Sequence, residues 1–340
     1  MTRAFITGLS GPTLTSDERA FLGDAAPWGI ILFKRNIQAP DQVRRLISEA
    51  REAVGHGPAP VLVDQEGGRV QRLGPPHWPV YPPGAAYGRL YDESSACGLR
   101  AARLGARLIA ADLAALGIDV DCLPIADVPV AGADGVIGDR AYGLAPAKVS
   151  AIAAAVAEGL MEGGVMPVLK HLPGHGRATA DSHMKLPVVS ADPDLLDASD
   201  FQAFRPLAQL PLGMTAHVVF TALDPVAPAT NSPIIIEQVI RGSIGFAGAL
   251  MSDDISMGAL TGTIGERTRA AIAAGCDLVL HCNGQLDEMR LVAEAAPTLS
   301  GAAERRTVLA LASRRAPAAI DHADARGEFS ALMGREMVAS

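Results

Sequence analysis

Eight short apolar runs recur along this 340-residue chain, and they constrain its fold more than any other feature of the sequence. They span residues 5–9, 30–33, 60–64, 118–122, 165–170, 212–217, 249–253 and 277–281. Each run is four to six residues long, which is too short for a buried helix, and Gly or Pro borders most of them. The sequence therefore predicts eight buried β-strands.

Segments rich in Ala, Leu and Arg separate these strands and have the composition of helices. The clearest examples are residues 41–54, 96–116, 147–162, 201–210, 265–274 and 287–296. Strands that alternate with helices and are almost wholly apolar are typical of a parallel sheet covered by helices. Eight such units favour an α/β fold, a single closed (β/α)8 barrel of the TIM type, over an open doubly wound sheet, which needs fewer strands.

The chain shows no linker, low-complexity tract or clear repeat, so we expect one catalytic domain over residues 1–340. The stretch 74–88 is rich in Pro, Gly and aromatic residues and is predicted to be a long ordered loop. From about residue 302 the chain is polar and helical in character, and we expect a peripheral tail there.

The composition excludes several classes of protein. A formal net charge of −8 argues against a general attraction to nucleic acid or to an anionic membrane. The four cysteines fit no zinc motif and are typical of reduced thiols. The N-terminal apolar stretch is too short for a signal peptide, and no run approaches the length of a membrane span. We therefore expect a soluble cytoplasmic protein without an obligate protein partner.

Polar residues gather at the carboxyl-terminal ends of the predicted strands. Asp64 ends the third strand, Lys170 and His171 end the fifth, and Asp253 ends the seventh. The opposite ends hold mostly Gly, Pro and Ala. Because the carboxyl-terminal ends of barrel strands meet on the face that carries the active site, this asymmetry favours an enzyme over a binding or scaffold protein.

The segment 170–183 holds three histidines and one aspartate. Asp181 and His183 are two residues apart, so the carboxylate could hold the imidazole and tune its pKa towards neutrality. Gly174 and Gly176 would give the segment freedom to move. A mobile polar loop is the plain alternative. A metal site is a third reading, but no H-E-x-x-H or similar pairing is present, so we expect no metal.

Adjacent Asp253 and Asp254 are expected to divide two tasks, one facing the barrel mouth and the other making structural hydrogen bonds. For Asp254 the alternative is a helix N-cap. Arg72, Arg140 and the lysine at the end of the fifth strand add donors to this face. That mixture of donors and acceptors suits a ligand with many hydroxyls, such as a sugar, better than a phosphate, which the aspartates would repel.

Four strings carry a resemblance to a known family: VDQEGGRVQRL, IGDRAYG, KHLPGHG…DSH and SDDISM. From the first strand to the eighth, the chain resembles the glycoside hydrolase family 3 β-N-acetylhexosaminidases of the NagZ type. The resemblance implies a single barrel that removes terminal, non-reducing β-linked N-acetylglucosamine with retention of configuration, without metal or organic cofactor. The usual substrates are small cytoplasmic cell-wall fragments, N-acetylglucosaminyl-1,6-anhydro-muramic acid with or without its peptide, in peptidoglycan recycling.

The family's functional residues fall on matching positions of this chain. The resemblance implies that Asp253 is the nucleophile and His183 the acid/base, with Asp181 as its partner. The implied sugar-binding residues are Asp64, Arg72, Arg140, Lys170 and His171. The sequence departs from the family pattern after S-D-D, where ISMGAL stands and Glu-Gly-Ala is common after Met. We expect this departure to affect only the edge of the site.

Two other functions stay open at this point. Retaining glycosidases usually use two carboxyl groups, and here His183 takes the place of the second. A neutral imidazole repels an incoming anion less than a carboxylate does, so a phosphorylase that resolves the glycosyl-enzyme with phosphate is one alternative. A non-catalytic sugar-binding barrel is the other, and it ranks last because Asp253 and His183 are both present.

Overall fold

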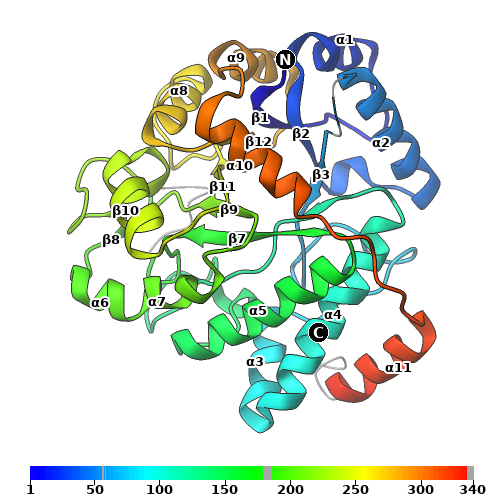
Figure 1. Ribbon diagram of the computed structural model, residues 1–340, viewed down its shortest axis with the longest axis vertical. Coiled ribbons are helices and arrows are strands. Elements are labelled where there is room, and N and C mark those ends of the chain that lie inside the picture. The colour runs from blue at the N-terminus through cyan, green and yellow to red at the C-terminus, as the bar shows by residue number, and fades with distance from the viewer. Residues whose placement is uncertain (56, 58, 179–185, 335–340) are drawn as a thin grey trace.

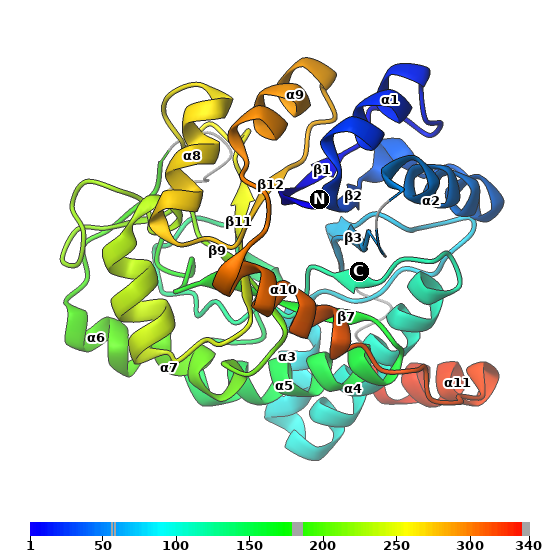
Figure 2. The ribbon, with the colours of Figure 1, turned by 45° about the horizontal axis from the view of Figure 1, so that its top comes forward.

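The computed structural model of the chain describes residues 1–55, 57, 59–178 and 186–334. Eight of the described strands close into one parallel barrel, which confirms the predicted (β/α)8 fold (Figures 1 and 2). They are β1 (Arg3–Gly8), β2 (Pro27–Leu32), β3 (Val61–Val63), β6 (Val120–Asp121), β7 (Met166–Leu172), β9 (Leu212–Thr215), β11 (Ala249–Asp254) and β12 (Leu278–His281). The barrel closes where β1 pairs with both β2 and β12.

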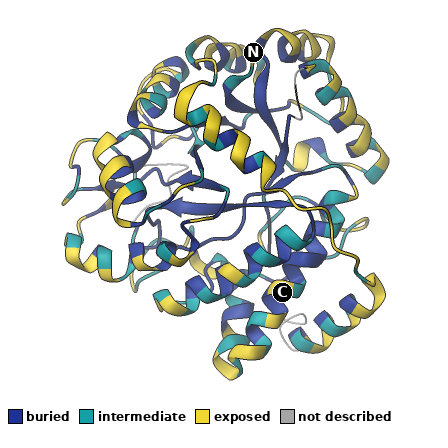
Figure 3. Cartoon of the chain, viewed as in Figure 1, coloured by how far each residue is buried: buried dark blue, intermediate teal, exposed yellow. Residues whose placement is uncertain are grey.

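Helices surround the barrel and bury the outer face of its strands (Figure 3). They include α1 (Ser16–Ala25), α2 (Pro40–Val54), α4 (Ser95–Ala114), α5 (Pro146–Glu162), α8 (Ile264–Ala274) and α9 (Leu286–Ala295). The helix predicted over 201–210 is shorter. It consists of α7 (Asp200–Phe204) and a 3-10 turn over Arg205–Leu207, because Pro206 has no N–H to continue an α-helix. A π-helix over Ile235–Ser243 follows β9 in place of an ordinary α-helix.

The prediction of a continuous loop over 74–88 is wrong, because helix α3 (Gly84–Glu93) begins inside it. The glycines that suggested a loop serve close packing instead. A Cβ atom at Gly84 would lie 2.0 Å from the carbonyl oxygen of Arg140, and one at Gly88 would lie 2.0 Å from that of Tyr142. Glycine therefore lets α3 lie directly against the backbone of residues 140–142, one of the segments that line the site described below.

The C-terminal helices pack on the barrel and on α4. Helix α10 (Gly301–Ala312) lies across the amino-terminal ends of the strands, where buried Ala310 joins the apolar interior of the barrel (Figure 2). Arg306 donates to Asp277 at 2.8 Å and Arg314 pairs with Asp119. Helix α11 (His322–Met333) places the ring of Phe329 in a buried position against α4. One end of the barrel is thus closed by α10, which leaves the carboxyl-terminal end for a site.

None of the helices in the described part of the chain is both long enough and apolar enough to cross a membrane.

Candidate active site

A cavity of about 280 Å³ opens at the carboxyl-terminal end of the barrel. Six of the residues predicted from the sequence line it together: Asp64, Arg72, Arg140, Lys170, His171 and Asp253. Phe33, Met214 and Met257 supply part of its apolar wall. An apolar wall with a few convergent polar groups is the usual character of a site for a small ligand.

Asp64 joins two of the cations in this cavity. Its Oδ1 accepts from Lys170 Nζ at 2.9 Å, and its Oδ2 accepts from Arg72 Nη2 at 3.0 Å. Burial by itself raises the pKa of the Asp64 carboxyl, but Lys170 and Arg72 outweigh burial and hold that pKa well below its ordinary value. Asp64 is therefore ionised throughout the physiological range, and both cations have fixed positions.

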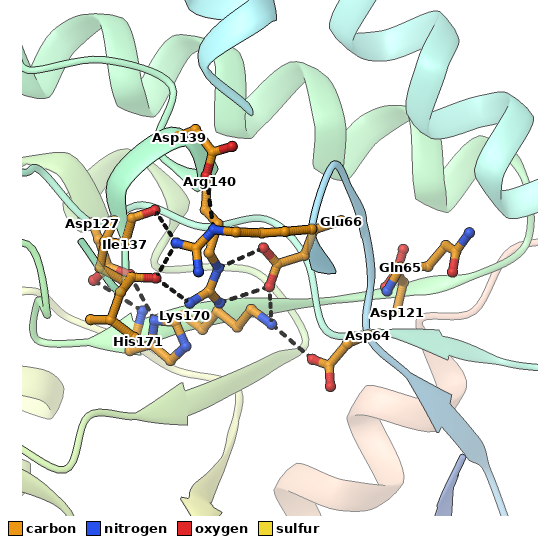
Figure 4. A network of polar contacts seen from close by, with 12 residues as sticks. Asp64, Gln65, Glu66, Asp121, Asp127, Ile137, Asp139, Arg140, Lys170 and His171 are labelled. Atoms are coloured by element: carbon orange, nitrogen blue, oxygen red, sulfur yellow. Dashed lines mark hydrogen bonds and ion pairs between the residues drawn. The ribbon is translucent and has the colours of Figure 1, made fainter. Parts of the chain in front are cut away.

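Glu66 is a member of this network that the sequence reasoning missed. It lies on β4 (Gln65–Gly67), which forms a hairpin with β5 (Val70–Gln71). Its carboxylate accepts from Arg140 Nε at 2.9 Å and Nη2 at 2.8 Å, and it pairs with Lys170 Nζ at 2.7 Å (Figure 4). Burial raises its pKa, yet Lys170 and Arg140 lower it to about 2. The sequence did contain a sign that Glu66 belongs to the site. Glu66 lies two residues after Asp64, and alternate residues of an extended segment share one face.

Asp127 is a second missed residue, in the segment that follows β6. This fully buried carboxylate contacts His171 Nδ1 at 2.7 Å (Figure 4). It also accepts from the backbone N–H of His175 at 2.6 Å. The rings of the two histidines meet edge to face, with their centroids 5.8 Å apart. Asp127 therefore holds the end of β7 and the turn that follows it.

Asp253 and its neighbour Asp254 have different surroundings at the end of β11. Asp254 accepts from Ser256 N at 3.0 Å, from Ser256 Oγ at 2.6 Å and from Cys282 N at 3.1 Å. Among the described residues, the Asp253 carboxylate accepts one hydrogen bond, from the amide of Asp254 at 2.7 Å. Burial raises the pKa of Asp253, but the nearby His217 and His171 outweigh it and lower that pKa. Asp253 is thus an ionised carboxylate that faces the cavity without a salt bridge in the part of the chain described.

His217, at the end of the sixth barrel strand, is a structural residue by its contacts. Its ring is fully buried, with Nδ1 2.7 Å from Thr230 Oγ1 and Nε2 3.0 Å from the carbonyl oxygen of Asp254. Both ring nitrogens therefore have partners within the protein, Nε2 at the end of β11 and Nδ1 at Thr230, and neither is available to exchange a proton with a ligand.

The segment that begins with Lys170 is described as far as residue 178. Gly176 packs so closely that a Cβ atom there would lie 2.1 Å from the carbonyl oxygen of Val128. Asp134 N donates to the carbonyl oxygen of Ala178 at 2.8 Å. Glycine at position 176 thus allows close packing against the segment that follows β6. The predicted catalytic residues Asp181 and His183 lie outside the described residues.

No group of three or more His, Cys, Asp or Glu side chains within residues 1–55, 57, 59–178 and 186–334 is arranged to hold a metal ion. The expectation that no metal is needed stays a prediction, because two residues of the 170–183 segment that could bind a metal, Asp181 and His183, lie outside those ranges.

Loss of one anchor of the cation network is expected to weaken substrate recognition. Asp64→Asn removes a buried, charge-assisted bond, so kcat/KM on an aryl N-acetylglucosaminide should fall by the equivalent of about 1.5–3 kcal/mol. Asp92→Asn is a matched control, because Asp92 forms a similar ion pair with Lys148 at 2.6 Å on the surface, where such pairs contribute little. An Asp64→Asn variant that folds and keeps the wild-type kcat/KM would contradict the assignment of Asp64.

Comparison with known proteins places this geometry in a family. Residues 7–310 match the family model described as the glycosyl hydrolase family 3 N-terminal domain. A β-hexosaminidase of Alkalilimnicola ehrlichii is 41% identical over 280 residues, which are 81% of this chain and 79% of that protein. A β-hexosaminidase of Methylococcus capsulatus is 39% identical over 311 residues, 90% of this chain and 88% of the relative.

The solved structures agree with the sequence relatives. NagZ from Neisseria gonorrhoeae in complex with N-trifluoroacetyl-D-glucosamine superposes with a TM-score of 0.84 at 31% identity, covering 99% of this chain and 98% of that one. The family match covers most of the chain, and its relatives share one enzymatic name. The chain therefore belongs to glycoside hydrolase family 3, in which it is a β-N-acetylhexosaminidase.

Proposed function

We propose that this enzyme is a retaining exo-β-N-acetylglucosaminidase that acts on small peptidoglycan fragments through a covalent glycosyl-enzyme. The observation that carries the proposal is Asp253, an ionised carboxylate at the end of β11 that faces the cavity without a cationic partner among the described residues. A carboxylate held in this way can attack a carbon atom, whereas the neighbouring Asp254 is occupied by Ser256 and Cys282.

The reaction has two displacement steps. In the first, an oxygen of Asp253 forms a bond to the anomeric carbon while the glycosidic bond breaks, and His183 gives its proton to the leaving oxygen. In the second, neutral His183 takes a proton from water, the water oxygen bonds to the anomeric carbon, and the bond to Asp253 breaks. Asp181 orients the ring of His183 in both steps. Two inversions give net retention, and the sequence of steps uses no metal or organic cofactor.

The rest of the cavity is proposed to hold the terminal sugar. Asp64, Arg72, Arg140, Lys170 and His171 come from three segments, 64–72, 138–140 and 170–171, and surround one small volume. A cavity of about 280 Å³ suits a single sugar ring, with the remainder of the substrate outside. This supports exo-action on a terminal residue. The structure of the Neisseria NagZ contains N-trifluoroacetyl-D-glucosamine, which supports N-acetylglucosamine as that residue.

The substrate class and compartment complete the proposal. We propose that its substrate is N-acetylglucosaminyl-1,6-anhydro-muramic acid, with or without its peptide, and that it acts in the cytoplasm. All four cysteines are free, and three of them are buried, which suits a reducing compartment.

Product analysis tests this function. The enzyme is incubated with the anhydro-disaccharide, with and without added phosphate, and the released sugars are identified. Free N-acetylglucosamine is expected at the same rate in both reactions, because Arg72, Arg140 and Lys170 are already paired with carboxylates and the Asp253 carboxylate, which has no cationic partner among the described residues, would repel a phosphate nucleophile. N-acetylglucosamine 1-phosphate that appears only with phosphate would identify a phosphorylase instead. No release from this disaccharide, together with release from an aryl N-acetylglucosaminide, would refute the substrate class but leave the enzyme class intact.

A further inference from the structure

Asp127 is a buried carboxylate whose two oxygens have different partners. Its Oδ1 accepts from the backbone N–H of His175 at 2.6 Å and from that of His171 at 3.3 Å. Its Oδ2 lies 2.7 Å from His171 Nδ1. The side chain is fully buried, and the interaction with His171 outweighs burial, which alone would raise its pKa, so that the pKa of Asp127 lies below its ordinary value.

These contacts determine which nitrogen of His171 carries hydrogen. An ionised carboxylate only accepts hydrogen bonds, so the hydrogen between the two side chains belongs to Nδ1 of His171. In the neutral ring, Nε2 is then an acceptor. The structure shows no hydrogen bond to this Nε2 from the described residues, and His171 lines the cavity. The ring of His175 packs against it, and burial followed by the influence of His171 lowers the pKa of His175 to about 4, so this neighbour is neutral.

We infer that Asp127 is a positioning residue: it fixes the tautomer and orientation of His171, so that Nε2 presents a hydrogen-bond acceptor to a hydroxyl of the sugar. The inference rests on the proposed function, in which His171 contacts the terminal sugar. Asp127 does not line the cavity itself, yet it would help to determine which ligand the cavity binds.

The chemistry of the surrounding side chains explains why an acceptor matters there. Lys170, Arg72 and Arg140 only donate hydrogen bonds. A hydroxyl that accepts from one of them still carries its own hydrogen, which needs an acceptor nearby. His171 Nε2 can supply one only while the hydrogen of the ring stays on Nδ1. Asp127 therefore makes the cavity complementary to groups that donate and accept together, as sugar hydroxyls do.

Asp127→Asn gives a sharp test, because the geometry dictates how the new amide lies. Two backbone N–H groups point at the Oδ1 position, so the amide oxygen has to occupy it. The NH2 group then faces His171 Nδ1 and forces that nitrogen to become an acceptor. At about pH 8, where an ordinary imidazole is neutral, the hydrogen should move to Nε2. Side-chain ¹⁵N NMR distinguishes the two tautomers, and the dissociation constant for N-acetylglucosamine is expected to rise on the order of tenfold.

Asp277→Asn is the matched control. Asp277 is also a buried carboxylate with a backbone donor, Leu250 N at 2.9 Å, and it holds Arg241 and Arg306 at the opposite end of the barrel. This variant should leave the His171 spectrum and the affinity for N-acetylglucosamine unchanged. Equal losses of affinity in both variants would show a merely structural effect and overturn the inference.

The outcomes separate this inference from the proposed function. A wild-type spectrum with the hydrogen on Nε2 refutes the role of Asp127, even if the Asn variant does not fold. An Asp127→Asn variant in which His171 changes its tautomer but the affinity for N-acetylglucosamine stays at the wild-type value would also refute that role. Wild-type enzyme that binds N-acetylglucosamine and shows the Nδ1–H tautomer, but releases no sugar from the anhydro-disaccharide, would instead refute the proposed function alone.

Discussion

Asp253→Ala is expected to lower kcat by several orders of magnitude on every N-acetylglucosaminide, because it removes the atom that bonds to the anomeric carbon. The fold should persist, since the described residues give the Asp253 carboxylate one hydrogen bond, from the amide of Asp254. Steady-state kinetics, with thermal unfolding measured in parallel, tests both parts of this expectation.

Asp254→Ala is the matched comparison at the next position. It removes the bonds to Ser256 and to the backbone of Cys282, so it should lower the thermal midpoint more than the Asp253 variant does. Its turnover should fall far less. If Asp254→Ala abolished turnover and Asp253→Ala did not, the nucleophile would be Asp254.

His183→Ala is expected to show an effect that depends on the leaving group. The natural disaccharide has a poor leaving group that needs a proton, so its glycosylation rate should fall on the order of 10²–10⁴-fold. An activated aryl glycoside departs without that proton and should be glycosylated at nearly the wild-type rate. Its deglycosylation should be slow, because water then lacks a base. Pre-steady-state kinetics separates these two steps.

Asp181→Ala serves as the companion variant and should show the same trend more weakly, because the imidazole remains. His217→Gln is a useful control, since both nitrogens of His217 are occupied by Thr230 and by the backbone of Asp254. That change should affect both substrate types alike. Equal slowing of both substrates by His183→Ala, at both steps, would make His183 a binding residue and would redirect the search for the acid to His175.

The strands were predictable because each barrel strand buries apolar side chains on both of its faces, one towards the barrel interior and one towards the surrounding helices. Each of the eight apolar runs overlaps a strand of the barrel, although β3 and β6 span only three and two residues. Helix α3 was missed for a physical reason: Gly84 and Gly88 are read as loop residues in a sequence, and the backbone of Arg140 and Tyr142 that requires them is 54 or more residues away. Contacts of that kind leave no local pattern.

The same reasoning explains which site residues were found. Asp64, Lys170 and Asp253 stand at strand ends, and topology alone brings strand ends together. Glu66 and Asp127 were not found, because their roles depend on partners 74 and 44 residues away, Arg140 and His171. A buried carboxylate beside a strand end is an ordinary feature of a sequence until the cation or imidazole that it holds is known.

Identification of the residue that carries the sugar tests the central claim most directly. The His183→Ala variant is mixed with an activated aryl N-acetylglucosaminide, quenched with acid and digested, and the modified peptide is sequenced by mass spectrometry. Slow deglycosylation in this variant should let the intermediate accumulate, with N-acetylglucosamine esterified to Asp253. Modification of any other residue, or a burst of aryl release that leaves no sugar on the protein, would contradict the covalent mechanism through Asp253.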